Sequence, residues 1–104
     1  MHAAKQEALI WSCPARADLR SIHDFIAHDS PYYAKKVVQD IRAKTDVLEQ
    51  LPKAGKKVPE LDEDRVRELS LYSYRIVYEI KEQGVFVLAV VHKRRQMEPD
   101  DIKA

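Results

Sequence analysis

Short apolar runs and helically spaced apolar residues alternate along the first half of the chain. Ala8 to Trp11 is apolar and ends in β-forming residues, which predicts a short first strand. Leu19, Ile22 and Ile26 then recur every three or four residues, as on the buried side of an amphipathic helix. Ser12 stands just before this stretch, where a serine side chain can cap the first turn. The pattern therefore predicts a strand followed directly by a helix.

A second amphipathic stretch begins at Ser30 and Pro31, an order of residues that commonly opens a helix. Its apolar stripe lasts about five turns and comprises Ala34, Val37, Val38, Ile41, Thr45, Leu48 and Leu51. Only a short polar turn around Asp29 separates the two stretches. The two helices are therefore expected to form an α-hairpin.

The second half of the chain is a polar segment followed by three strand patterns. The segment from Pro52 to Asp64 contains prolines and a glycine and is interpreted as a loop. Strand patterns follow at Val66 to Leu71, Ser73 to Ile80 and Val85 to Val91, and their short separators favour antiparallel hairpins. The order β-α-α-β-β-β predicts a small α+β domain in which an α-hairpin packs on an antiparallel sheet.

We interpret residues 1–104 as one domain, because 104 residues are too few for two independent cores and no repeat or linker interrupts them. The core is expected over about residues 8–96, with a C-terminal tail over residues 97–104. Apolar residues make up 45% of the chain and charged residues 34%, which indicates a soluble folded domain rather than a disordered one.

Composition also bounds the compartment and the cofactors. Cys13 is the only cysteine, which excludes an internal disulfide and fits a reducing cytoplasm. No basic region precedes an apolar run at the N-terminus, and no apolar run approaches the roughly 20 residues of a membrane helix. His2, His23 and His28 show no metal-ligand spacing with His92, and two glycines cannot form a phosphate-binding loop. We therefore expect a cytoplasmic protein without a metal, a cofactor or a membrane partner.

The strand over Ser73 to Ile80 has two contrasting faces. Tyr74, Ile76, Tyr78 and Ile80 share one face and are expected to pack on the helices. Arg75 lies on the opposite face. Arg67 in the preceding strand is expected to neighbour Arg75 across the hairpin, so that the second face shows two arginines.

The apolar run Val85 to Val91 passes without a break into His92, Lys93, Arg94 and Arg95. The candidate binding residues are Arg67, Lys93, Arg95, Lys56 and Lys57. A metal-independent nuclease needs an acid or base beside the scissile phosphate, and cations for the charge that develops. His92 fits the first role, and Arg75 with Arg94 or Arg95 fits the second. The alternative that these residues are simply solvated at strand ends stays open.

Four segments point to a protein family by their sequence and by their order along the chain. They are LIWSCPARADLRSIHDFIAHDSP, KVPEL, VRELSLYSYRIVYEI and VFVLAVVHKRR. Together they resemble the RelE/ParE superfamily of toxins from type II toxin–antitoxin modules. The similarity extends from about Ala8 to Gln96 and implies the same order of helices and strands. The family's central arginine falls on Arg75, and its basic residue after the last strand falls on Arg94 or Arg95.

The resemblance implies one of two activities. RelE-like members cleave mRNA in the ribosomal A site with arginines, lysines and often a C-terminal tyrosine or histidine, whereas ParE-like members are linked to inhibition of DNA gyrase. No tyrosine follows Tyr78, and the V-x-H-x-x-R pattern around His92 is more similar to the ParE branch. The net charge of +1 also gives little attraction to ribosomal RNA, because such binding gains from neutralised phosphates.

The leading hypothesis is a ParE-like toxin of the plasmid-stabilisation kind, which arrests growth through DNA gyrase and is neutralised by a cognate antitoxin. The alternatives are a RelE-like mRNA interferase that acts on the ribosome and mRNA, and a non-toxic member that only binds. An antitoxin segment is expected to cover the α-hairpin groove and the sheet edge. The expected assembly is a homodimer or a heterotetramer with the antitoxin.

Overall fold

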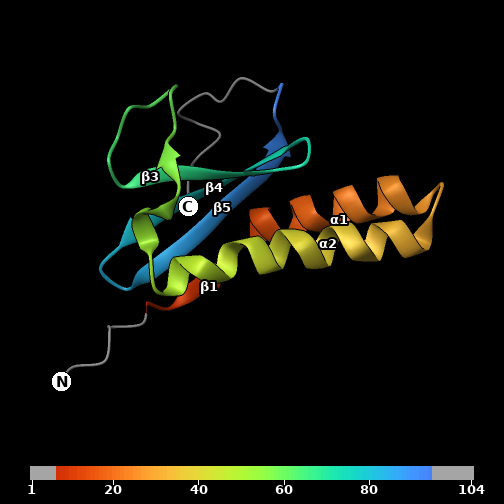
Figure 1. Ribbon diagram of the computed structural model, residues 1–104, viewed down its shortest axis with the longest axis horizontal. Coiled ribbons are helices and arrows are strands. Elements are labelled where there is room, and N and C mark those ends of the chain that lie inside the picture. The colour runs from red at the N-terminus through yellow and green to blue at the C-terminus, as the bar shows by residue number, and fades with distance from the viewer. Residues whose placement is uncertain (1–6, 95–104) are drawn as a thin grey trace.

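The computed structural model describes residues 7–94, so the predicted tail lies outside it, and it confirms the α+β class (Figure 1). Its elements are β1 (Leu9–Trp11), α1 (Cys13–Ala27), α2 (Pro31–Thr45), the 3-10 helices η1 (Asp46–Glu49) and η2 (Pro52–Ala54), β2 (Lys56–Lys57), β3 (Val66–Leu71), β4 (Tyr74–Lys81) and β5 (Gly84–His92). The strands form one sheet in the order β1-β5-β4-β3-β2. Because β1 pairs in parallel with β5 and the other neighbours pair antiparallel, the sheet is mixed rather than wholly antiparallel.

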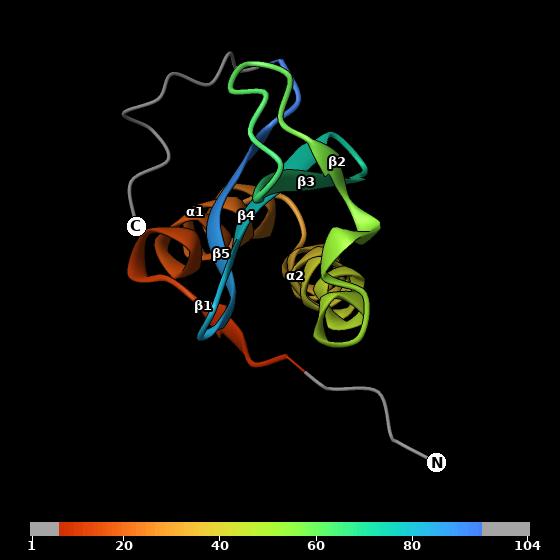
Figure 2. The same cartoon turned by 90° about the vertical axis from the view of Figure 1, so that its left-hand side faces the viewer.

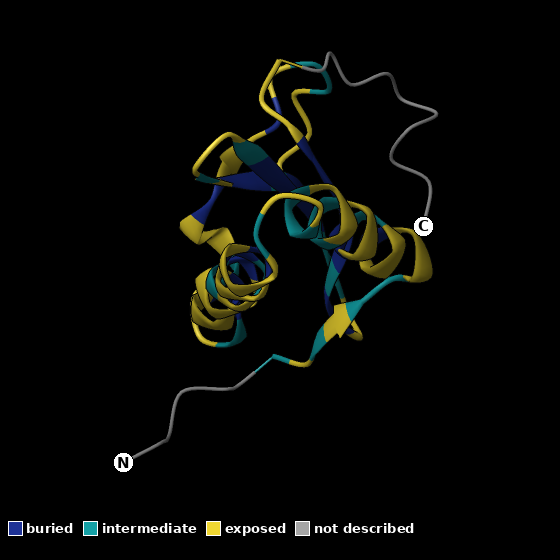
Figure 3. Cartoon of the chain, turned by 90° about the vertical axis from the view of Figure 1, so that its right-hand side faces the viewer, coloured by how far each residue is buried: buried dark blue, intermediate teal, exposed yellow. Residues whose placement is uncertain are grey.

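The two helices begin where serine side chains cap them. The Ser12 hydroxyl accepts a hydrogen bond from the backbone N–H of Ala15, and the Ser30 hydroxyl accepts one from the N–H of Tyr33. Both helices lie against one face of the sheet and turn their exposed sides outward (Figures 2 and 3). α2 ends at Thr45, earlier than its apolar stripe suggests, and the chain continues as η1. Within residues 7–94, no helix is long and apolar enough to span a membrane.

Hydrophobic clusters lie on both faces of the sheet. On the helix-covered face, Ile76 and Tyr78 of β4 pack in one cluster with Ile41 of α2, which confirms the predicted inner face of that strand. On the opposite face a smaller cluster comprises Val58, Val66, Val77, Ala89 and Val91, with Leu61 packed against it. The segment between β2 and β3 thus covers the second face. This double covering explains why β5 is apolar on both sides.

Two-residue turns set the register of the last three strands. Leu71 pairs with Tyr74 across the β3–β4 turn, and Lys81 pairs with Gly84 across the β4–β5 turn. Gly84 has a φ of 143°, and a Cβ added there would lie 2.6 Å from the carbonyl oxygen of Ala8. The close approach of the chain before β1 therefore requires a glycine at this position.

Candidate functional site

Two carboxylates hold Arg75 on the sheet face opposite the helices. Its guanidinium donates hydrogen bonds to both carboxylate oxygens of Glu60, at 2.7 and 2.8 Å, and to Oε1 of Glu68, at 2.6 and 3.1 Å. Each of the three side chains is no more than 9% exposed. The hydrogen bonds to Glu60, followed by those to Glu68, raise the pKa of Arg75 above its usual range. Arg75 is therefore a nearly buried cation that is already paired with two acids.

An open cleft of about 570 Å³ adjoins this group. Its lining comprises Lys56, Pro59, Glu60, Glu68, Ser70, Arg75 and Lys93. Lys56 of β2 and Lys93 after β5 are exposed, and neither has an ion-pair partner within residues 7–94. The structure therefore brings three predicted site residues to one cleft, together with two glutamates that the sequence pattern did not single out.

His92 lies on the other side of the sheet from Arg75. His92 pairs with Tyr74 while Arg75 pairs with Val91, and successive residues of a strand point to opposite faces. The His92 ring is exposed, with its centroid 6.2 Å from that of Tyr74, and its Nδ1 accepts a hydrogen bond from the N–H of Arg94. His92 and Arg75 therefore do not face a common phosphate position.

The expectation that Arg67 neighbours Arg75 on one face of the sheet is wrong. Arg67 pairs with Tyr78, whereas Arg75 pairs with Ser70. The two-residue turn between β3 and β4 fixes this register, and a shift of one residue moves a side chain to the opposite face. It is Glu68 that shares a face with Arg75, so the nearest charge from β3 neutralises this cation instead of adding to it.

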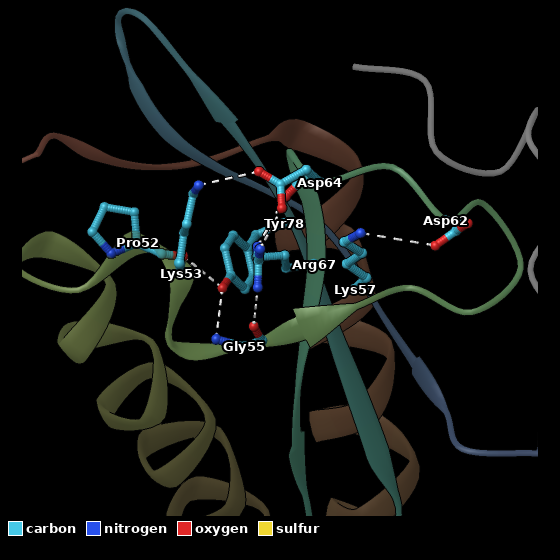
Figure 4. Close-up of polar contacts among 8 residues, drawn as sticks. All are labelled: Pro52, Lys53, Gly55, Lys57, Asp62, Asp64, Arg67 and Tyr78. Atoms are coloured by element: carbon cyan, nitrogen blue, oxygen red, sulfur yellow. Dashed lines mark hydrogen bonds and ion pairs between the residues drawn. The ribbon is translucent and has the colours of Figure 1, made fainter.

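Side chains from β3 and β4 form hydrogen bonds with the backbone of the segment that leads into β2 (Figure 4). The Arg67 guanidinium donates to the carbonyl oxygen of Gly55 at 2.8 Å. The buried Tyr78 hydroxyl accepts a hydrogen bond from the Gly55 N–H at 2.9 Å and donates one to the Pro52 carbonyl at 2.7 Å. Burial raises the pKa of the Tyr78 hydroxyl. These contacts fix the position of Lys56, which follows Gly55 directly.

The remaining predicted cations lie apart from the buried group. Lys57 is exposed, with its Nζ 4.0 Å from Oδ1 of Asp62 (Figure 4). Arg94 is exposed after β5, while Arg95 and His2 lie outside the described residues. Within residues 7–94, no three His, Cys, Asp or Glu side chains gather closely enough to hold a metal ion. The site is thus a cationic surface built around an arginine that is already neutralised.

Comparisons with known proteins agree with this fold. A family model described as the ParE toxin of the type II toxin–antitoxin system parDE matches residues 9–97. The chain therefore belongs to the ParE family of toxins from type II toxin–antitoxin systems. No curated protein matches the sequence significantly.

Two solved structures resemble the chain over most of its length. A structure of the chromosomal ParDE toxin–antitoxin system from P. aeruginosa matches with a TM-score of 0.71 and 27% identity, over 85% of this chain and 97% of that one. The toxin–antitoxin complex RelBE2 from Mycobacterium tuberculosis matches with a TM-score of 0.54 and 22% identity, over 84% of this chain and 98% of that one. The second likeness concerns the fold alone.

Proposed function

We propose that this toxin arrests growth by binding DNA gyrase in the cytoplasm and that a cognate antitoxin neutralises it. The family match and the likeness to a chromosomal ParDE system support the ParE branch of the superfamily. On this proposal the protein acts as a binding inhibitor, without bond-breaking chemistry of its own.

The ion pairs of Arg75 with Glu60 and Glu68 are the observation that favours gyrase inhibition over mRNA cleavage. A cation that stabilises charge on a phosphate in the transition state must be able to contact that phosphate. Glu60 occupies both terminal nitrogens of Arg75, and Glu68 adds a second acid. An incoming phosphate would have to displace a carboxylate and would be repelled by it. With His92 on the other face, this arrangement favours binding over phosphodiester cleavage.

The exposed cations of the site form the proposed contact surface for the target. This surface comprises Lys56, Lys57, Lys93 and Arg94, and Arg95 belongs to it by its place in the sequence. Arg67 and Arg75 would position this surface, because their guanidinium groups are already bonded to neighbouring segments. Exposed lysines and arginines without buried partners suit an acidic protein surface.

An apolar cleft at the end of the helical layer offers a place for the antitoxin. The cleft measures about 510 Å³ and is lined by Gln50, Leu51, Pro52, Lys53, Ala54 and Ile80. Leu51 is 60% exposed, and Val47 nearby in sequence is 41% exposed. Contiguous exposed apolar side chains commonly mark a protein partner's site. We therefore propose that an apolar antitoxin segment binds here.

Parallel assays of the purified protein test the proposal. The protein should inhibit supercoiling by gyrase and leave mRNA intact in a translating extract. Lys56→Gln with Lys93→Gln should weaken the inhibition, whereas Arg65→Gln with Lys81→Gln, which removes the same charge from another surface, should not. Cleavage of mRNA together with unaffected supercoiling would overturn the proposal in favour of the interferase.

A further inference from the structure

Three arginines on the helical layer have no carboxylate partner among residues 7–94. Arg16 and Arg20 of α1 and Arg42 of α2 line a cleft of about 420 Å³ between the two helices. Arg16 contacts Sγ of Cys13 at 3.3 Å, and the guanidinium of Arg42 lies 5.4 Å from the centroid of the Trp11 ring. Within residues 7–94, none of the three arginines forms an ion pair. This group lies on different elements from the cleft beside Arg75.

Arg16 and Arg20 do not stabilise α1, so helix stability does not explain why arginines stand at these positions. Arg16 and Arg20 stand one turn apart on α1, where like charges repel. The first turn of α1 contains no acidic residue, although the helix dipole favours acids there. Among residues 7–94, Asp24 is the one carboxylate that lines the cleft, and its Oδ1 lies 3.1 Å from Nδ1 of His23. A local excess of positive charge in a nearly neutral protein indicates an anionic partner.

The side chains around the arginines narrow the class of partner. A second cleft, of about 460 Å³, is lined by Cys13, Arg16, Ala17, Arg20 and Ser21, which are polar or small. The apolar residues of the first cleft are Leu19, which is buried, and Val38, which is half-buried. An amphipathic helix would need exposed apolar anchors, and these two clefts offer none.

Single-stranded nucleic acid fits the clefts no better, because its unstacked bases bind to exposed aromatic rings. The exposed aromatic residues of the helices are Phe25, Tyr32 and Tyr33, and none of them lines either cleft. The ring of Trp11 is half-buried and lies beneath Arg42. A surface of arginines between small side chains suits the regularly spaced phosphates of a duplex, which are contacted without reading bases.

We propose that Arg16, Arg20 and Arg42 bind the phosphodiester backbone of duplex DNA. The toxin would then contact the DNA held by its target through the helical layer, and the target itself through the surface around Lys56 and Lys93. The choice of DNA over duplex RNA rests on the proposed function, since gyrase acts on DNA.

The salt dependence of DNA binding tests this proposal. Each phosphate contact contributes about −0.9 to the slope of log affinity against log salt, so three contacts give a slope of about −2.7. Between about 50 and 200 mM salt, the full chain should lose about 40-fold in affinity for a labelled duplex DNA, measured by fluorescence anisotropy. The variant Arg16→Gln with Arg20→Gln should bind more weakly and lose only about 3-fold over the same range.

Matched control variants distinguish binding at a specific site from attraction by the protein's overall charge. Arg16 and Arg20 are exposed and glutamine is a good helix former, so circular dichroism should show an intact fold. Arg65→Gln with Lys81→Gln lowers the net charge equally and should keep the slope of the unmodified protein. An unchanged slope in the Arg16 and Arg20 variant, or no binding of the unmodified protein at low salt, would overturn the proposal.

Competition decides between classes of anion. Unlabelled duplex DNA should displace the probe more effectively than polyglutamate. Equal or better displacement by polyglutamate would overturn the assignment to a phosphodiester backbone. If the protein bound DNA through these arginines but did not inhibit gyrase, the proposed function alone would be refuted. If it inhibited gyrase but did not bind DNA through these arginines, this inference alone would be refuted.

Discussion

Replacing Arg75 with alanine should destabilise the protein severely, because it leaves Glu60 and Glu68 facing each other without their shared cation. Both carboxylates are no more than 9% exposed, so water cannot fully compensate them. Removing one partner from a buried ion pair costs about 3–5 kcal/mol, a large share of the roughly 5–15 kcal/mol that stabilises a typical domain. A domain of this size loses roughly 4–8 °C in Tm per kcal/mol. The expected fall in Tm is therefore about 12–40 °C.

Thermal and urea unfolding monitored by circular dichroism measure this effect. The triple variant Arg75→Met, Glu60→Gln and Glu68→Gln is the control, because it removes the uncompensated charges together with the arginine. It should recover at least about half of the lost stability. An Arg75→Ala protein with the Tm of the unmodified protein would refute the buried pairing and restore Arg75 as a free phosphate ligand. Loss of growth arrest in Arg75→Ala would indicate a catalytic role only if the variant kept the Tm of the unmodified protein.

Two further substitutions test individual hydrogen bonds. Tyr78→Phe leaves the Gly55 N–H and the Pro52 carbonyl without their partner and should cost about 1–3 kcal/mol in urea unfolding; an unchanged midpoint would contradict this. The hydrogen bond from the Tyr72 hydroxyl is the main cause that lowers the pKa of Asp40, so Tyr72→Phe should raise that pKa in an NMR titration. The lowered pKa of Asp40 stabilises the folded state at pH values above 3.8, the pKa of this carboxyl in the unfolded chain. This stabilisation should be lost as the pH falls through the lowered pKa of the folded state. An Asp40 titration that does not move in Tyr72→Phe would contradict the assignment.

Local sequence signals predicted the helices, the last three strands and the inner face of β4. Ser12 and Ser30 cap the helices as expected, because capping depends only on residues within one turn. The error at Arg67 was avoidable in principle. A two-residue turn at Tyr72 and Ser73 forces Leu71 to pair with Tyr74, and counting back from that pair places Glu68 on the face of Arg75.

Other parts of the site had no local signal in the sequence. Glu60 lies in an irregular segment, eight residues before Glu68, and its approach to Arg75 depends on how that segment packs. The packing is set by distant contacts, including the insertion of Val58 into the cluster with Val77. Likewise, β1 pairs with β5 across most of the chain, which periodicity alone cannot indicate.

Gyrase supercoiling in the presence of the triple variant Arg75→Met, Glu60→Gln and Glu68→Gln tests the central claim most directly. The exposed Lys56 and Lys93 remain in this variant, while the arginine that an mRNA interferase would need is gone. If Arg75 supports the contact surface only through the fold, the folded variant should inhibit gyrase within a few-fold of the unmodified protein. Complete loss of inhibition by a well-folded variant, or mRNA cleavage by the unmodified protein that the variant lacks, would contradict this account.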